Sequence, residues 1–404
     1  MLWTLKKATY RSYQSAMKLA SPLIPFPVPE ILSGAGCIKD LPGHVKSAGV
    51  SKVMVVTDKG IIKAGLLKRL TDALEKADVD YYVFDEVQPN PTIINIEAGL
   101  KLYHANQCKG IIAIGGGSPM DCAKTIGARV TNPRRSVLKM RGLFKVWRKL
   151  PPFYAIPTTA GTGSETTIAA VVTDSETHEK FAIVSLKIVP LIAVLDPELM
   201  VGLPPHITST TGMDALTHAV EAYIGRQAGT FEDEQAEKAT KIIFDILEDV
   251  YRDGSDLEKR TQMALASFYA GTAFTRAYVG YVHAIAHNMG GLYGVPHGLA
   301  NAIILPYVLE YSKKEAQTKL AKLAIAGGIA KAGEPEAEVV ERFIEKIKTM
   351  NKNMEIPTFI AELQKKDIPL IAQRALAEGN PGYPVPRIMD QQECEALISK
   401  LLPE

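Results

Sequence analysis

The chain has 404 residues, of which 47% are hydrophobic and 22% charged, and its 46 basic and 44 acidic residues leave a formal net charge of +2. This length suggests two domains, and the composition is that of an ordinary soluble globular protein. The near balance of charge argues against a nucleic-acid-binding surface, which would need a basic patch. No uncharged apolar run reaches the roughly 18 residues that a membrane span requires.

The four cysteines lie far apart in the sequence and form no C-x-x-C pair: Cys37, Cys108, Cys122 and Cys394. We interpret them as reduced thiols, which belong neither to a disulfide framework nor to a thiolate metal site. A cytoplasmic protein without a transmembrane segment is therefore expected.

Residues 1–29 contain four basic residues and no acidic one. These charges interrupt the continuous apolar stretch that a secretory signal would need. A basic amphipathic segment can touch a membrane surface. The interpretation favoured here is an extension that packs on a partner subunit or stays mobile.

From residue 30, apolar runs typical of strands alternate with segments of helical spacing. Strands are predicted within 52–58, 79–85, 109–115 and 151–157, with helices within 64–78 and 93–107 between them. Such alternation predicts a largely parallel, buried sheet with crossover helices. The basic stretch at 134–152 is predicted to cross the surface between two elements.

From about residue 204, β-branched runs become scarce and helical spacing dominates. It is clearest over 212–224, 233–251, 260–274 and 318–332. We therefore predict a basic extension over 1–29, an α/β domain over 30–203 and an all-helical domain over 204–404.

The stretch "IIAIGGGSPMDCAK" (111–124) has the features of an anion-binding turn. An apolar strand leads into three glycines, Ser118 is predicted as a helix N-cap, Pro119 as the first helical residue, and Asp121 as the partner in a capping box. Free N–H groups and the helix dipole would face a ligand there. The dinucleotide fingerprint is not met because Met120 replaces its third glycine, and the P-loop ending is absent. The pattern fits a pyrophosphate site or a merely tight turn.

Two further features favour a nucleotide. Asp58 ends an upstream strand, where a carboxylate can accept a hydrogen bond from a ribose hydroxyl and repel a 2′-phosphate. The loop "PTTAGTGSE" (157–165) offers hydroxyls and backbone amides, and its apolar flanks place it at the end of a strand. The alternative for this loop is a polar surface turn.

Histidines and a carboxylate recur at helical spacing in the second half. His283 and His287 lie four residues apart, as do Asp214 and His218, while His297 stands between a proline and a glycine and is predicted to lie in a turn. Imidazole and carboxylate together suit a divalent metal. Spacing alone leaves open which four of these five residues bind it.

Four motifs together resemble the iron-containing (group III) alcohol dehydrogenases: "GGGSPMDCAK", "PTTAGTGSE", "GMDALTHAVE" and "GYVHAIAHNMGGLYGVPHGLAN". The resemblance extends from about Pro29 to the C-terminus, with the motifs in the family's order. It implies an N-terminal α/β dinucleotide-binding domain and an all-α C-terminal metal-binding domain, in the dehydroquinate synthase-like superfold.

The resemblance also implies roles for individual residues. The metal ligands would be Asp214, His218, His283 and His297, and His287 would contact substrate and cofactor or relay a proton. Asp58 would favour NAD over NADP. The remaining implied cofactor-binding residues are Gly115, Gly116, Gly117, Ser118, Thr158, Thr159, Thr162, Asn90 and Lys180.

The activity implied is the NAD(H)-linked, metal-dependent interconversion of a primary alcohol and an aldehyde, by a homodimer or higher homo-oligomer. The metal would be Fe²⁺, although Zn²⁺ generally binds such ligands more tightly. The basic segments at 1–29 and 134–149 depart from the family pattern, which affects expectations about substrate choice and assembly.

Other activities were weighed against this one. No tyrosine has a lysine four residues on, and no cysteine cluster exists, so the short-chain and medium-chain dehydrogenase patterns are absent. Within the same superfold, glycerol dehydrogenase-like polyol oxidation and dehydroquinate synthase-like activity are the nearest alternatives. A metal-dependent hydrolase could use the same histidines, and a non-catalytic metal- or nucleotide-binding protein is the remaining alternative.

Overall fold

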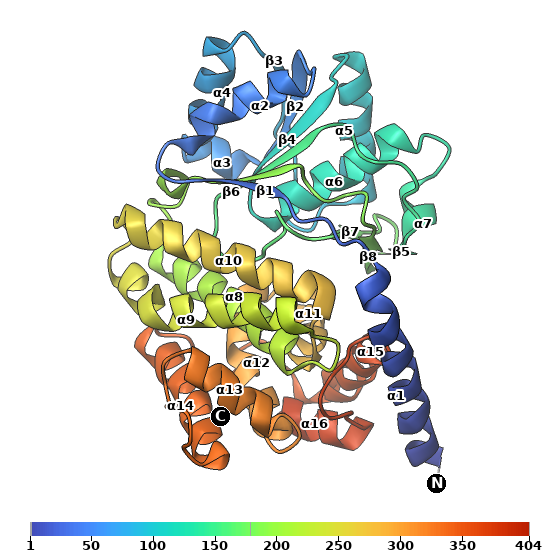
Figure 1. The fold of residues 1–404 in the computed structure, drawn as a ribbon. Helices are drawn as coiled ribbons and strands as arrows, with labels where there is room; N and C mark the ends of the chain where they lie inside the picture. Colours follow the sequence, from blue (N-terminus) through green and yellow to red (C-terminus); the bar gives the residue numbers. More distant parts are fainter. Residues whose placement is uncertain (1, 178, 404) are drawn as a thin grey trace. The chain divides into compact units, whose positions relative to one another are not determined.

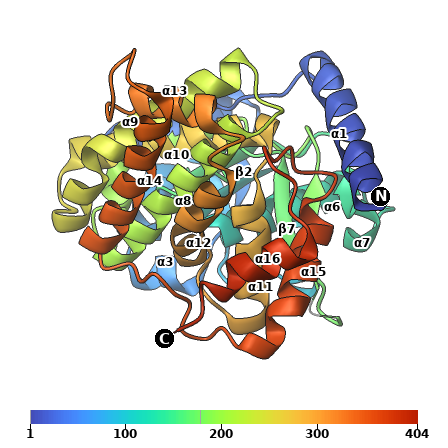
Figure 2. The ribbon, with the colours of Figure 1, turned by 90° about the horizontal axis from the view of Figure 1, so that it is seen from below.

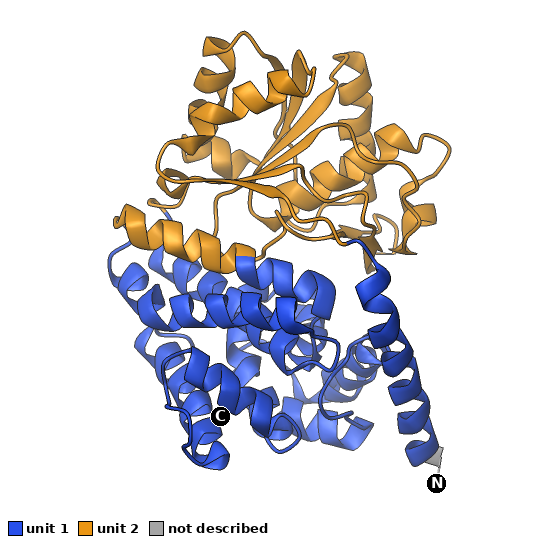
Figure 3. Ribbon diagram, viewed as in Figure 1, with its two compact units in different colours: residues 1–25, 203–254, 269–404 blue, residues 26–202, 255–268 orange. Residues whose placement is uncertain are grey.

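The computed structural model describes residues 2–177 and 179–403 and divides into two compact units (Figures 1 and 3). Unit 1 contains Met1–Pro25, Leu203–Gly254 and Tyr269–Glu404, and unit 2 contains Phe26–Gly202 and Ser255–Phe268. Residues up to 25 thus group with unit 1. The functional division at residue 203 stays a prediction.

Unit 2 is built on a six-stranded sheet in which every neighbouring pair is parallel. Its order is β1-β9-β6-β4-β2-β3. The strands are β1 (Glu30–Ser33), β2 (Lys52–Val56), β3 (Asp80–Phe84), β4 (Gly110–Gly115), β6 (Phe153–Pro157) and β9 (Ile192–Leu195).

Alternate residues of the central strands feed two separate hydrophobic cores. On one face, Val53 and Ile112 pack with α2 (Leu41–Ser47) and α4 (Leu67–Lys76). On the other face, Met54 and Ile111 pack with α5 (Ile93–Ala105) and α6 (Gly117–Thr131). Because both faces are covered (Figure 1), these strands are apolar throughout, which is why they were recognisable in the sequence.

A second sheet, which was not predicted from the sequence, is formed by strands that lie between β4 and β9 in the chain. It has the order β5-β8-β7, with β5 (Gly142–Leu143), β7 (Ala169–Thr173) and β8 (Lys180–Val184). The basic stretch at 134–152 contributes β5 and the short helix α7 (Val137–Met140), so it carries local structure of its own. The other helical elements of this unit are α3 (Lys59–Lys63), η2 (Cys37–Asp40) and η3 (Pro197–Leu199).

Unit 1 is helical, and α8 (Pro205–Ile224) and α11 (Tyr281–Tyr293) lie at its centre. Helix α8 packs on α9 (Thr230–Arg252) and α12 (His297–Ser312), and α11 packs on α12 and α15 (Ile368–Gly379), as Figures 1 and 2 show. The remaining helical elements are α13 (Gln317–Ala326), α14 (Glu336–Asn353), α16 (Gln391–Ser399), η1 (Ser21–Leu23) and η4 (Lys365–Asp367). Helix α10 (Leu257–Ala277) is divided between the units, with its residues up to Phe268 in unit 2 and the rest in unit 1. The predicted fold class, a parallel α/β unit and an all-α unit, is confirmed.

The basic N-terminal segment forms helix α1 (Leu2–Ala20). Arg11 donates hydrogen bonds to the carbonyl oxygens of Val385 and Pro386, at 2.7 and 2.6 Å, and Gln14 donates to the carbonyl of Tyr383 at 2.8 Å. The segment is therefore a helix that is hydrogen-bonded to its own chain, and its packing on a partner subunit stays a prediction. Across the described residues, no helix is long and apolar enough to cross a bilayer.

Candidate metal centre and nucleotide-binding loops

The carboxyl edge of the main sheet carries the residues predicted to bind nucleotide. The direction in which successive strands are added across the sheet reverses between β2 and β4. The segment after β2 leads to β3 on one side, whereas the segment after β4 leads to β6 on the other side. Ligands of open α/β sheets bind at such a switch point, beyond the carboxyl ends of the strands. Asp58 follows β2, and the glycine loop follows β4.

The turn after β4 requires glycine at position 115. Gly115 has φ +146°, and a Cβ there would lie 2.7 Å from the Pro119 ring. Helix α6 begins at Gly117 with Gly116 as its N-cap, so the prediction of Ser118 as N-cap was wrong. Asp121 does not complete a capping box, because its carboxylate binds the Ser164 hydroxyl and the Val171 N–H instead.

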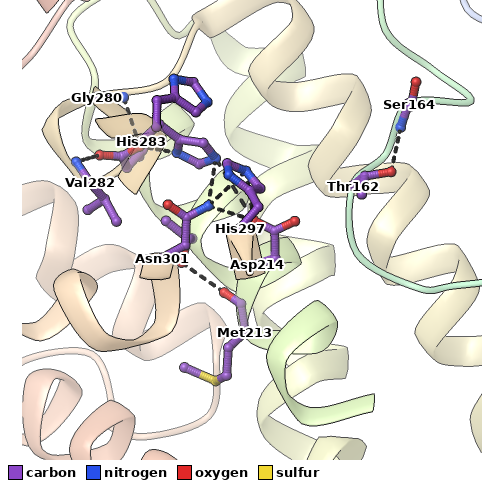
Figure 4. Close-up of polar contacts among 12 residues, drawn as sticks. Thr162, Ser164, Met213, Asp214, Gly280, Val282, His283, His297 and Asn301 are labelled. Atoms are coloured by element: carbon purple, nitrogen blue, oxygen red, sulfur yellow. Dashed lines mark hydrogen bonds and ion pairs between the residues drawn. The ribbon is translucent and has the colours of Figure 1, made fainter. Parts of the chain in front are cut away.

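The polar loop 157–165 lies against this glycine turn. The Thr158 N–H donates to the Gly115 carbonyl at 3.0 Å, and a Cβ on Gly116 would lie 3.8 Å from the Thr159 hydroxyl. A Cβ on Gly117 would lie 3.5 Å from the Thr162 side chain, whose hydroxyl accepts the Ser164 N–H (Figure 4). The structure therefore brings together two loops that are 40 residues apart in the sequence.

A buried lysine anchors the far end of loop 157–165. The Lys124 ammonium donates to the carbonyl oxygens of Ser164, Thr167 and Ala169 at 2.6, 3.1 and 2.8 Å. Its side chain is fully buried, and this burial lowers the pKa of Lys124 to about 8. Helix α6 thus supplies both the glycine turn and the anchor of the neighbouring loop.

Asn90 and Lys180 join the same edge. Lys180 Nζ donates to the Asn90 side-chain oxygen at 2.8 Å, and the Asn90 N–H donates to the Ser118 hydroxyl at 3.2 Å. Asp58 caps helix α3, with its carboxylate accepting the Ile61 N–H at 3.1 Å. The residues expected to contact NAD thus lie at the carboxyl ends of β2, β4 and β6 or beside them, apart from Lys180, which begins β8 of the second sheet and reaches Asn90.

In unit 1, three helices bring a carboxylate and three imidazoles together. Asp214 and His218 share a face of α8, and His283 lies in the first turn of α11. His297 is the first residue of α12 rather than part of a turn, which corrects the prediction. One ligand atom from each of these four residues lies within 4.8 Å of those of the other three.

Burial makes this cluster chemically unusual. Asp214, His218 and His283 are 1, 4 and 2% exposed, whereas the His297 side chain is 40% exposed. Burial, together with the neighbouring histidines His218 and His297, holds the pKa of His283 well below its ordinary value. A neutral imidazole keeps the lone pair that a metal ligand needs.

The side-chain amide of Asn301 lies next to three of the four clustered residues. Its amide nitrogen donates to Asp214 Oδ1 at 2.7 Å and lies 3.2 Å from His283 Nε2 and 3.1 Å from His297 Nε2 (Figure 4). Its own side-chain oxygen is buried and has no hydrogen-bond partner among the described residues. Three imidazole nitrogens and a carboxylate oxygen facing one point fit a divalent ion such as Fe²⁺ or Zn²⁺.

His287 belongs to the surroundings of this cluster. Its ring stacks on that of His297 with centroids 5.3 Å apart, and its Nδ1 lies 2.7 Å from a carboxylate oxygen of Glu378. The Tyr383 hydroxyl donates to the same oxygen at 2.8 Å. Although burial acts to raise the pKa of Glu378, the charge of His287 and the two hydrogen bonds lower it.

Comparison with known proteins agrees with this geometry. The family model "Iron-containing alcohol dehydrogenase" matches residues 28–197, and "Fe-containing alcohol dehydrogenase family, C-terminal" matches residues 208–402. The chain belongs to the iron-containing alcohol dehydrogenase family. This confirms the resemblance seen in the sequence.

Individual members of the iron-containing alcohol dehydrogenase family cover nearly the whole chain. The 1,3-propanediol dehydrogenase of Klebsiella pneumoniae is 40% identical over 354 residues, which are 87% of this chain and 91% of that protein. The NAD-dependent methanol dehydrogenase of Bacillus methanolicus is 35% identical, over 93% of this chain and 98% of that protein. A solved structure of 1,3-propanediol oxidoreductase, 38% identical, covers 93% of this chain and 99% of that chain with a TM-score of 0.90.

Several residues that shape the sites were missed in the sequence. Asn301 lies four residues after His297, and Glu221 three residues after His218, so helical spacing could have found both. Lys124 could have been found in the same way, three residues after Asp121. Glu378 meets His287 across 91 residues, and no local pattern predicts that contact.

Glu165, at the end of loop 157–165, makes the stability of unit 2 depend on pH. Burial raises the pKa of this carboxyl to about 7 from an ordinary 4.5, although its own backbone hydrogen bond and the charge of Lys124 act to lower it. The folded state then binds more protons than the unfolded state between these two values. Stability from this group is therefore lost as pH rises through that window.

We expect Glu165→Gln, which removes the buried charge, to change the thermal midpoint little at about pH 5 and to stabilise the protein by about 2 kcal/mol at about pH 8. Thermal melts at both pH values measure this difference. The exposed Glu176→Gln variant should match the wild type throughout. An equal effect of Glu165→Gln at the two pH values would contradict the assignment.

Proposed function

We propose that this protein catalyses the NAD(H)-linked interconversion of a primary alcohol and an aldehyde. The observation that carries the proposal is the convergence of Asp214, His218, His283 and His297 in a chain that belongs to the iron-containing alcohol dehydrogenase family. The named relatives are alcohol dehydrogenases, and one is described as NAD-dependent. Neither glycerol dehydrogenase-like polyol oxidation nor hydrolysis is better supported.

We assign these four residues as ligands of one divalent metal, Fe²⁺ with Zn²⁺ as the alternative. The bound ion would act as a Lewis acid on the alcohol or aldehyde oxygen. The buried position of three ligands excludes water from their side of the site and holds them in one geometry, which lowers the cost of assembling the site. Asn301 fixes the Asp214 carboxylate through its hydrogen bond.

In the oxidative direction, bound NAD would accept the hydride of the carbinol carbon, and the hydroxyl proton would go to a base. We assign proton exchange to His287, because imidazole titrates near neutral pH and Glu378 holds Nδ1 of this ring. Because Nδ1 is engaged, the proton would be exchanged at Nε2 of His287. The products are an aldehyde, NADH and one proton, and the reverse reaction consumes all three.

We further propose that unit 2 holds NAD. The pyrophosphate would lie at the N-terminus of α6, against Gly115–Gly117 and Ser118, where backbone N–H groups and the helix dipole favour an anion. Thr158, Thr159, Thr162, Asn90 and Lys180 would contact the remainder of the cofactor. A cytoplasmic homodimer is part of the same proposal, and the four cysteines, all free thiols, support a reducing compartment.

The activity should depend on the metal and on His283. We expect metal-free protein, reloaded with Fe²⁺ or Zn²⁺ without oxygen, to form NADH from primary alcohols, and His283→Ala to lose on the order of 100-fold or more in kcat/KM. NADH absorbance across a panel of simple alcohols and diols measures this. His206→Ala, an exposed histidine on the same helix α8, is the matched control and should keep full activity. Absence of turnover with every metal, despite NAD binding, would contradict the proposal.

The cofactor preference should depend on the charge of Asp58. We expect Asp58→Ser, which can still cap α3, to lower the ratio of kcat/KM for NAD to that for NADP by about tenfold, because the repulsion of a 2′-phosphate is lost. Asp80→Ser is the control, because Asp80 begins strand β3 and so lies at the amino edge of the sheet, away from Asp58. A ratio unchanged in Asp58→Ser would show that another residue selects the cofactor.

A further inference from the structure

Glu221 is a buried carboxylate that the proposed reaction does not use. It follows Asp214 and His218 along the same face of α8, and its side chain is 3% exposed. A carboxylate in such surroundings persists only where hydrogen bonds compensate for the loss of water.

Three N–H groups of one short segment supply this compensation. Glu221 Oε2 accepts the Gly280 N–H at 2.8 Å and lies 2.6 Å from His283 Nδ1, and Oε1 accepts the Val282 N–H at 2.7 Å. The donors on this segment appear in Figure 4. Gly280 is the N-cap of α11, so its N–H and that of Val282 are groups the helix itself leaves without partners.

The contact with an ionised Glu221 determines which nitrogen of the His283 ring carries the proton. A carboxylate can only accept hydrogen bonds, so Nδ1 holds the hydrogen and Nε2 holds the lone pair. The amide of Asn301, which donates to Asp214, lies 3.2 Å from this Nε2, as expected if Nε2 is an acceptor. The lone pair of His283 is thereby directed at Asp214 and His297.

We propose that Glu221 is the positioning residue of the metal centre: one carboxylate caps α11 and fixes the tautomer and orientation of His283, and so joins the two helices that carry three of the four ligands. The inference rests on the proposed metal site. A histidine ligand whose other nitrogen donates to a carboxylate binds metal more tightly, and loss of such a partner typically weakens metal affinity about 10- to 100-fold.

Glu221→Gln tests this with the volume of the side chain conserved. Glutamine offers one acceptor oxygen to three donors, so at least one of them must face the amide NH₂ whichever way the side chain turns. We expect metal-free Glu221→Gln to bind Co²⁺ about 10- to 100-fold more weakly than the wild type in competition with a chelator, with a changed Co²⁺ absorption spectrum. Its circular dichroism and NADH affinity should match the wild type.

A matched control separates positioning from capping alone. Glu232 is also buried, 8% exposed, and caps α9 by accepting the Gly229 N–H at 2.8 Å, with no histidine on its carboxylate. Glu232→Gln should therefore cost stability but leave Co²⁺ affinity unchanged. An equal loss of affinity in both variants would overturn the inference.

A second variant displaces the carboxylate without altering it. A Cβ on Gly280 would lie 2.6 Å from Glu221 Oε1, and φ at this residue is −136°, which alanine adopts readily. Gly280→Ala should therefore move Glu221 and weaken Co²⁺ binding as well. Wild-type affinity in folded Glu221→Gln and Gly280→Ala, or a failure of both to fold, would overturn the inference.

The proposed function fails separately. If the wild type and His283→Ala bind Co²⁺ equally, the metal site itself is wrongly assigned. If His283→Ala loses Co²⁺ while Glu221→Gln and Gly280→Ala retain it, the site stands and only the role of Glu221 is refuted.

Discussion

The ligand atoms of Asp214, His218, His283 and His297 lie within 4.8 Å of one another, and the architecture of unit 1 depends on this convergence. Removing a carboxylate and imidazoles from water is costly unless each gains a partner. Asn301 supplies a hydrogen bond to Asp214, and burial keeps His283 neutral because its pKa is held well below the ordinary value. Long, buried helices are needed to hold such a cluster rigidly, which explains why α8 is almost wholly enclosed along its second half.

Unit 2 meets a different constraint, which is the approach of an anion to backbone amides. The parallel sheet places every strand end that matters on one edge, and the reversal between β2 and β4 opens that edge for a ligand. Gly115 allows the turn, while Lys124 and Asp121 on α6 hold the neighbouring loop in place. Helix α6 thus organises both loops of the proposed nucleotide site.

Much of this could be predicted from the sequence, because apolar strands buried on both faces and histidines at helical spacing leave clear patterns. The parallel sheet and the helical second unit were predicted in this way. Spacing gave five candidate metal ligands, and the family resemblance selected the four that cluster. The β5-β8-β7 sheet was missed since its strands are short and half-exposed. The start of α6 was misplaced because serine is a common N-cap, whereas the glycine before it fills that role here.

What could not be predicted are contacts between residues distant in sequence. The pairing of His287 with Glu378 and the docking of Arg11 on Val385 depend on tertiary packing. Patterns of spacing identify the face of a helix but not what that face meets. Helical spacing places Glu221 and Asn301 on the same faces as the ligands, but their contacts with His283 and Asp214 depend on how the helices pack.

The most direct test of the account is anomalous X-ray diffraction from crystals of the protein loaded with Fe²⁺ or Zn²⁺, recorded at the absorption edge of the metal. The account predicts one strong peak in unit 1, about 2.0–2.2 Å from an oxygen of Asp214 and from one nitrogen each of His218, His283 and His297. A peak bound elsewhere, or a peak that contacts His287 in place of one of these histidines, would contradict it.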